Sequence, residues 1–169
     1  MREWTVGGAL IRHGDSLVLV ANRRRDSSIE WTPPGGVIDE GESITDGLVR
    51  EVIEETGLVV DRLVRCAYRV EVEAPGLEWI MRVEAWEVEV DGGVPSEFDF
   101  VDPDGIVEQC SVVPLPDVPG LLAASPQWIH IPIGHWIDAV PVGGHDHVPD
   151  FRFLVDGTDR RDLRVQRVE

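Results

Sequence analysis

An acidic stretch with regular spacing lies between Trp31 and Leu58. Three of its glutamates, Glu51, Glu54 and Glu55, are three or four residues apart, which on an α-helix brings side chains over one another. Carboxylates this close repel one another unless a cation is present. Hard divalent cations such as Mg²⁺ and Mn²⁺ take oxygen ligands and share the phosphate oxygens of a substrate. The three glutamates therefore indicate a metal and pyrophosphate site.

A metal ion at this site would neutralise a diphosphate, polarise its phosphorus and lower the pKa of a bound water that then attacks. Hydrolysis of a phosphoanhydride is the expected chemistry. Arg50 lies beside the glutamates, and because a guanidinium binds carboxylates bidentately, we expect it to orient them rather than react. An acidic, solvated helix face would explain an isolated pair of glutamates equally well.

The element that positions these carboxylates is a helix predicted over residues 44–56. Ser43 and Asp46 resemble a capping box at its start, and Gly57 is a typical C-cap. Its apolar side is predicted to contain Leu48, Val49, Val52, Ile53 and Thr56. Before the helix, Pro33 and Pro34 predict an irregular or edge segment over residues 31–36, where the following glycines let the backbone approach a ligand closely.

The full spacing of the stretch is more specific than its charge. It reads Gly36-x5-Glu42-x7-Arg50-Glu51-Val52-x-Glu54-Glu55-x-Gly57-Leu58. This pattern resembles the Nudix box of the Nudix hydrolase superfamily at every fixed position. The resemblance implies a MutT-like α+β protein with the Nudix fold, an α/β/α sandwich around a central mixed β-sheet.

The resemblance also implies an activity: a hydrolase of acid anhydrides in phosphorus-containing compounds. Such an enzyme cleaves a nucleoside diphosphate linked to another moiety and uses Mg²⁺ or Mn²⁺. ADP-ribose, a nucleotide sugar and an (oxidised) nucleoside triphosphate all remain open as substrates. A nucleotide-sensing regulatory Nudix domain without turnover is the alternative, although such a domain has no need of three intact carboxylates.

Roles for individual residues follow from the resemblance. The metal ligands would be Glu51, Glu54 and Glu55, together with the carbonyl oxygen of Gly36. The residues expected to act in catalysis are Glu54, Arg50 and Glu51. Glu42, which pairs with the arginine, and Gly57 would be structural.

Many members of the family recruit a further acidic residue from a loop about forty positions beyond the box. The candidates in this chain are Glu97, Asp104 and Glu108, of which Glu97 and Glu108 rank first. An exposed acidic loop would explain each of them equally well.

Substrate contacts are weakly marked in the sequence. Residues 22–30 form a polar loop, and its arginines are more easily explained as a solvated turn than as a phosphate clamp. If the loop does contact substrate, Arg23 and Arg25 are the candidates, and Trp31 could stack on a base.

The remaining elements are predicted from alternation and turn residues. We expect strands over residues 4–11, 16–21, 59–72, 78–90 and 106–113, and a helix near residues 128–136 that Pro132 limits to a turn or two on either side. The chain divides into a Nudix domain, residues 1–138, and a β-hairpin-like extension, residues 139–169, packed on the domain or on a partner subunit. A homodimer therefore stays open.

Charge and composition limit the partners. The chain has 32 acidic and 15 basic residues and a formal net charge of -17, which repels nucleic acids and anionic membranes. A small nucleotide derivative as the partner is what the Nudix resemblance implies. Cys66 and Cys110 have no metal-binding spacing, and the first residues do not resemble a signal peptide. We therefore expect a cytoplasmic protein. The sequence His145-Asp146-His147 is interpreted as a surface loop.

Overall fold

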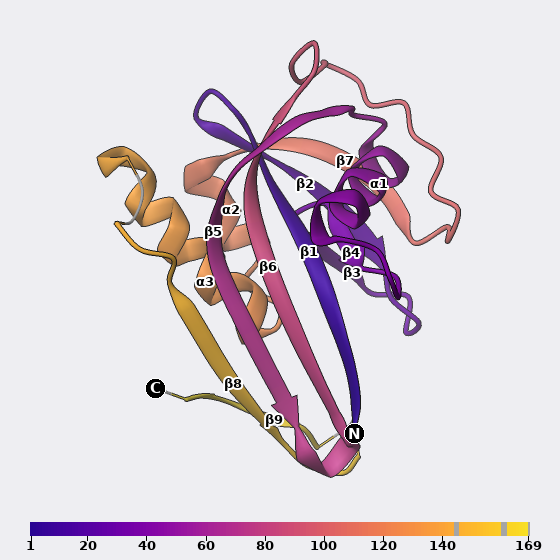
Figure 1. Cartoon of the computed structure of the whole chain (residues 1–169), viewed down its shortest axis with the longest axis vertical. Coiled ribbons are helices and arrows are strands. Elements are labelled where there is room, and N and C mark those ends of the chain that lie inside the picture. The colour runs from indigo at the N-terminus through magenta and orange to yellow at the C-terminus, as the bar shows by residue number, and fades with distance from the viewer. Residues whose placement is uncertain (144–145, 160–161, 169) are drawn as a thin grey trace.

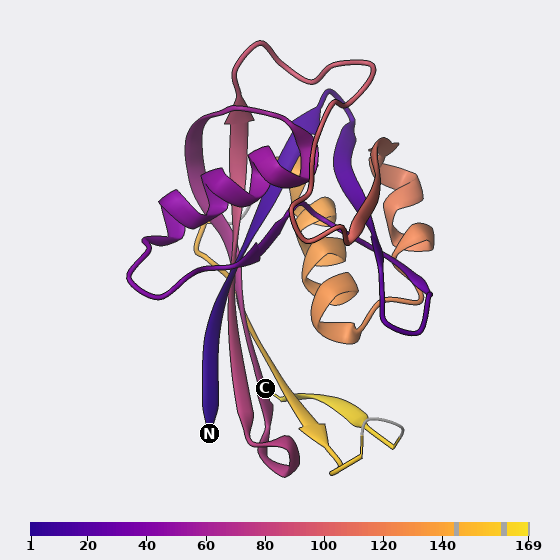
Figure 2. The same ribbon diagram turned by 90° about the vertical axis from the view of Figure 1, so that its right-hand side faces the viewer.

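The computed structural model describes residues 1–143, 146–159 and 162–168, and within them the chain forms three layers. Helix α1 (Ile44–Thr56) covers one face of a mixed β-sheet, and helices α2 (Val118–Leu121) and α3 (Gln127–Ala139) cover the other (Figure 2). This arrangement confirms the predicted α+β fold with a central mixed sheet. None of the described helices is long and apolar enough to cross a membrane.

The strands follow one main path with two branches (Figure 1). Their order is β3-β2-β1-β6-β5-β8-β9, with β4 paired to β1 and β7 paired to β2. Neighbouring strands are parallel where β1 meets β6 and where β5 meets β8. The strands are β1 (Arg2–His13), β2 (Ser16–Arg23), β3 (Ile29–Thr32), β4 (Gly35–Val37), β5 (Val60–Ala74), β6 (Trp79–Val90), β7 (Val107–Pro114), β8 (Asp150–Asp156) and β9 (Arg164–Val168).

The first hairpin of the sheet separates soon after its turn. Strands β1 and β2 pair only at Arg12↔Leu17 and His13↔Ser16, and then β1 runs along β6 while β2 lies between β3 and β7. Their separation leaves the middle of β1 free to pair with the short strand β4. The break between β3 and β4 falls at Pro33 and Pro34, inside the segment where the sequence predicted irregular or edge structure. This route brings the two glycines of β4 under helix α1.

Helix α3 differs from its prediction. It runs without interruption from Gln127 to Ala139 with Pro132 inside it, whereas the sequence predicted that this proline would limit the helix. A proline removes one backbone hydrogen bond and costs about 3 kcal/mol in a helix interior. Pro132 is buried with its neighbours Ile133 and Trp136, and packing of this apolar side against the sheet outweighs the lost bond.

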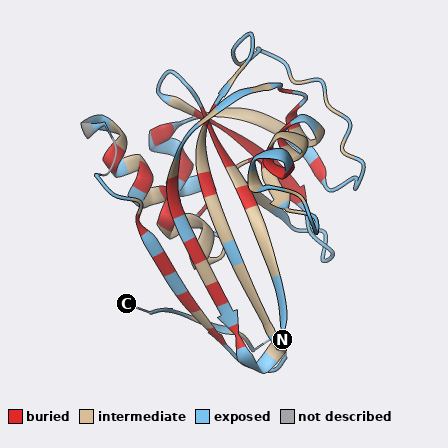
Figure 3. Cartoon of the chain, viewed as in Figure 1, coloured by how far each residue is buried: buried red, intermediate tan, exposed pale blue. Residues whose placement is uncertain are grey.

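The C-terminal strands continue the same sheet. Strand β8 lies parallel to β5, and Phe151, Phe153 and Val155 alternate along it as buried residues (Figure 3). These three side chains share one core with Leu10 and Trp136. Strand β9 then pairs antiparallel with β8, as expected for a hairpin. The predicted domain boundary after residue 138 stays a prediction, and His145 of the predicted surface loop lies outside the described residues.

Candidate active site

Helix α1 begins and ends where its capping residues predict. The Ser43 hydroxyl oxygen accepts a 3.1 Å hydrogen bond from the Asp46 N–H, and Gly57, at φ 73°, ends the helix in the left-handed conformation. The buried side is narrower than predicted. It consists of Gly47, Leu48, Val52 and Thr56, while Val49 is half-buried and Ile53 is exposed.

The glutamate face of α1 lies on the two glycines of strand β4. A Cβ atom on Gly36 would be 2.6 Å from Glu51 Oε2, far inside normal contact distance. One turn further along the helix, Glu55 Oε2 accepts a 2.8 Å hydrogen bond from the Gly35 N–H. The positions of both carboxylates therefore depend on the two glycines of β4, which have no side chains. No contact tests the Gly36 carbonyl oxygen as a ligand, so that role stays a prediction.

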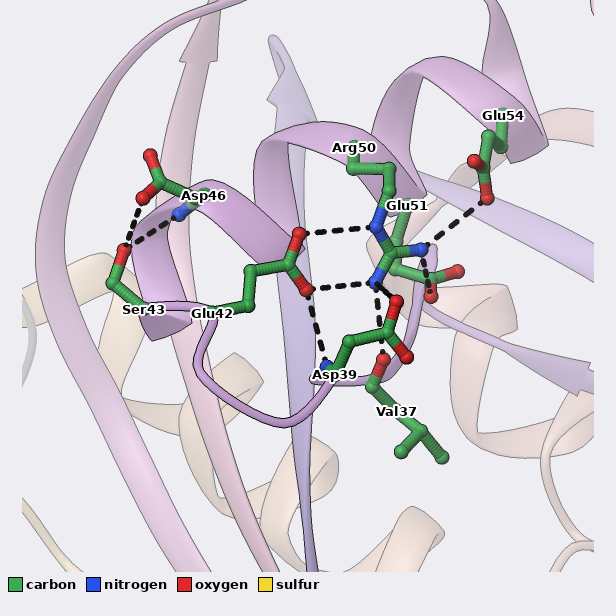
Figure 4. Close-up of polar contacts among 8 residues, drawn as sticks. All are labelled: Val37, Asp39, Glu42, Ser43, Asp46, Arg50, Glu51 and Glu54. Atoms are coloured by element: carbon green, nitrogen blue, oxygen red, sulfur yellow. Dashed lines mark hydrogen bonds and ion pairs between the residues drawn. The ribbon is translucent and has the colours of Figure 1, made fainter.

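Arg50 joins the carboxylates into one network (Figure 4). Its Nε and Nη2 donate to the two oxygens of Glu42 at 3.1 and 2.9 Å. Its Nη1 donates to Glu51 at 2.7 Å and to Glu54 at 3.4 Å, and Nη2 also donates to the Val37 carbonyl oxygen at 3.2 Å. Because these acceptors engage all three guanidinium nitrogens, the geometry favours an orienting role.

Burial changes the protonation of the glutamates. The pKa of Glu55 is raised to about 8, chiefly because the carboxylate is buried, and the bond from Gly35 only partly opposes this. Negative charges on Glu51, Asp102 and Glu54 raise it further. Burial also raises the pKa of Glu51, although Arg50 lowers it. Without a metal ion, the positive charge of Arg50 does not fully compensate the buried carboxylates.

The acidic loop between β6 and β7 provides further carboxylates whose charges act on the glutamates. The charge of Asp104 acts on Glu51, and that of Asp102 acts on Glu55. Glu97 and Glu108 ranked first from the sequence because a sequence gives no distances between the loop and the helix. The run Asp102-Pro103-Asp104-Gly105 is, however, a turn signature that could have marked this position.

The two acidic residues ranked first in the sequence have other surroundings. Glu108 forms an ion pair with Arg23. Glu97 lines a cavity of about 760 Å³ that also includes Cys110. The pKa of the Cys110 thiol is raised to about 12 by burial and also by the charge of Glu55.

The predicted substrate-binding residues are only partly brought to the site. Arg23 pairs with Glu108, while Arg25 is exposed and has no ion pair within the described part of the chain. Trp31 packs against the core that includes Trp136 of α3, on the face opposite α1. These contacts favour a solvated arginine turn, and the substrate roles stay predictions.

The carboxylate oxygens of the glutamates suit a hard divalent cation, although they are not yet arranged around a common metal position. Across residues 1–143, 146–159 and 162–168, no three His, Cys, Asp or Glu side chains are already arranged to hold a metal ion. Arg50 binds two of the three glutamates instead. Mg²⁺ commonly takes only one or two carboxylates and completes its shell with water and substrate phosphates. The carboxylate oxygens of the glutamates suit such an ion.

The comparison with known families decides the identity of the fold. The family model of the NUDIX domain matches residues 1–136. The chain belongs to the Nudix family. This Nudix protein is a hydrolase acting on phosphoanhydrides.

Individual relatives match this chain at low sequence identity or over only part of its length. The oxidized purine nucleoside triphosphate hydrolase of Mus musculus is 29% identical over 109 residues, which cover 64% of this chain and 68% of the mouse protein. An RNA pyrophosphohydrolase of Sphingopyxis alaskensis is 41% identical over 51 residues, 30% of this chain and 32% of that protein. The solution structure of the E. coli ORF135 protein has a TM-score of 0.68 at 18% identity, covers 86% of this chain and 96% of its own, and supports the fold alone.

Proposed function

We propose that this Nudix hydrolase is a metal-dependent pyrophosphohydrolase of a nucleoside diphosphate linked to another moiety. The supporting observation is the arrangement of Glu51 and Glu55 on the glycines of β4, with Arg50 bound to both Glu51 and Glu54. Mg²⁺ or Mn²⁺ would be held by the three glutamates with the Gly36 carbonyl oxygen. Asp104, whose charge acts on Glu51, is the best-supported further ligand.

A divalent cation bound here would neutralise phosphate charge and lower the pKa of a coordinated water. The protein's own part is to prepare the carboxylates. Arg50 orients Glu51 and Glu54 through its Nη1 group, at 2.7 and 3.4 Å, and its charge partly opposes the effect of burial on the pKa of Glu51. Of the two glutamates that contact Arg50, Glu54 has the longer contact, 3.4 Å against 2.7 Å for Glu51, so it is freer to accept a proton from an attacking water.

The proposal includes three classes of substrate, which differ in the leaving group. ADP-ribose, nucleotide sugars and oxidised nucleoside triphosphates are the proposed substrates. The mouse relative's name favours testing oxidised purine triphosphates first, and that of the bacterial relative adds RNA to the panel.

The test is a substrate panel with Mg²⁺ and with Mn²⁺, assayed by identifying the products. We expect metal-dependent release of a nucleoside monophosphate or its RNA equivalent. Glu54→Gln should lower kcat by about 10²- to 10⁴-fold, the usual contribution of a positioned proton acceptor. Glu40→Gln is the matched control, because Glu40 is exposed and has no hydrogen bond or ion pair within the described residues.

Two results would contradict the proposal. If Glu54→Gln and Glu55→Gln both kept full turnover on the best substrate, the metal assignment would be wrong. Tight nucleotide binding without hydrolysis across the whole panel would instead favour a nucleotide-sensing domain.

A further inference from the structure

The acidic loop between β6 and β7 is held at two points against elements of the active site. At the first point, the Asp99 carbonyl oxygen lies so close to Gly57 that a Cβ on this glycine would be 1.9 Å away. At the second, the Arg23 N–H donates a 2.8 Å hydrogen bond to the Ile106 carbonyl oxygen. The end of α1 and the end of β2 thus define where the loop crosses the site.

Between these two points the Asp102 side chain closes a tight turn. Its Oδ2 accepts hydrogen bonds from the Ile106 N–H at 2.6 Å and the Val107 N–H at 2.8 Å, and its Oδ1 accepts from the Asp104 N–H at 3.1 Å. The Asp102 carbonyl oxygen also accepts from the Gly105 N–H at 3.1 Å. A carboxylate that binds its own backbone in this way fixes a turn locally.

The turn carries one exposed carboxylate, that of Asp104, on the loop that runs between Gly57 and Arg23. Asp104 is exposed, and its side chain has no hydrogen bond or ion pair within the part of the chain that the structure describes. Burial is the main cause of the raised pKa of Glu51, and the charge of Asp104 adds to it. Nothing in the Asp104 side chain's own contacts keeps it there, so its position depends on the backbone of the turn.

We infer that Asp102 is a positioning residue, which fixes residues 102–107 so that the Asp104 carboxylate remains available to a divalent cation at Glu51 and Glu55. This inference rests on the proposed function. Asp102 itself acts through the backbone, because its two oxygens are already occupied by three N–H groups. A metal ion that drew Asp102 away would have to break all three bonds.

The inference predicts that Asp102 and Asp104 work as one unit. The test compares Asp102→Ala, Asp104→Asn and the double variant in the full chain, with Mn²⁺ affinity measured by titration without substrate. Each single variant should weaken Mn²⁺ binding by roughly 10- to 100-fold, the usual effect of losing a residue that orients a ligand. The double variant should be no weaker than Asp104→Asn alone, since residues that act together are not additive.

Two further variants separate positioning from charge and from folding. Asp99→Asn removes the same charge from the same loop and should leave Mn²⁺ affinity unchanged. Asp102→Asn keeps one acceptor oxygen, so it should retain part of the affinity, and it replaces the alanine variant if that one does not fold. The melting temperature without metal is recorded for every variant.

The outcomes are distinct. Wild-type Mn²⁺ affinity in Asp102→Ala, with only a lower melting temperature, would reduce Asp102 to a structural turn and overturn the inference. Effects that multiply in the double variant would also overturn it. Failure of the proposed function would instead appear as a wild-type protein that hydrolyses no member of the substrate panel, a result that does not depend on the loop variants.

Discussion

The backbone N–H of Gly35 donates a 2.8 Å hydrogen bond to the Glu55 carboxylate. This is the one hydrogen bond that Glu55 makes among the described residues, and the side chain is otherwise buried beside other acidic groups. A single neutral donor does not offset the cost of burying a charge. Glu55 is therefore protonated at neutral pH in the metal-free protein, and a cation must displace that proton.

The first prediction concerns metal binding and pH. Because the pKa of Glu55 is raised to about 8, Mn²⁺ affinity should increase by about tenfold per pH unit below pH 8 and level off above it. Titrations between about pH 6 and pH 9 measure this slope. Glu55→Gln should bind Mn²⁺ more weakly and with little slope, and an unchanged slope in this variant would assign the proton to another group.

The same proton makes the stability of the metal-free protein depend on pH. An unfolded chain loses the Glu55 proton near the ordinary pKa of 4.5, whereas the folded protein keeps it up to about 8. The folded state therefore binds more protons in this window, and the free energy of unfolding should fall as pH rises through it. Urea unfolding with a chelator should show a smaller fall for Glu55→Gln. Equal falls in the two proteins would contradict the burial argument.

A prediction about Gly36 separates activity from stability. In Gly36→Ala the new Cβ would meet the Glu51 carboxylate at 2.6 Å, and the flexible end of that side chain must move. Displacing a ligand by about 1 Å can lower kcat by about 100-fold, while the melting temperature should change little. Gly8→Ala on the neighbouring strand is the control, since its nearest contact would be an ordinary 3.9 Å to Ala85. Full activity in Gly36→Ala would show that Glu51 need not stay on the glycine.

A prediction about Gly57 concerns stability. Gly57 and Gly41 both have positive φ, 73° and 85°, but only Gly57 faces a close neighbour, the Asp99 carbonyl oxygen. Gly41→Ala should cost on the order of 1 kcal/mol from backbone conformation alone. Gly57→Ala should cost clearly more in urea unfolding and should also weaken Mn²⁺ binding, because it displaces the acidic loop. An equal loss in the free energy of unfolding for the two variants would mean that the acidic loop moves away from residue 57 at little cost.

A prediction about Arg50 uses a matched ion pair elsewhere. Arg50→Lys cannot reproduce the two-oxygen contact with Glu42 while also reaching Glu51 and Glu54, so kcat/KM should fall by about 10- to 100-fold. Arg62→Lys changes a similar two-oxygen contact, with Glu89 on the exposed sheet, and should leave activity unchanged. Equal activity of both variants would show that the contacts of Arg50 with the glutamates are not needed for catalysis.

The sequence by itself determined what depends on neighbours a few residues apart. Ser43, Asp46 and Gly57 specified the ends of α1, and the three- and four-residue spacings specified the glutamate face, because capping and helical periodicity are local. The alternation of β8 and the hairpin with β9 were readable for the same reason. The spacing of the box also sufficed to recognise the Nudix family, which the match over residues 1–136 confirmed.

Only the tertiary structure decided which distant residues meet these local elements. Pro132 stays inside α3 because its buried side packs on the sheet, and Glu108 turns to Arg23 because β7 pairs with β2. The acidic loop rests on Gly57 although about forty residues separate Asp99 from it. Such contacts arise when long segments close and pack together, and neither helical periodicity nor turn chemistry encodes their partners.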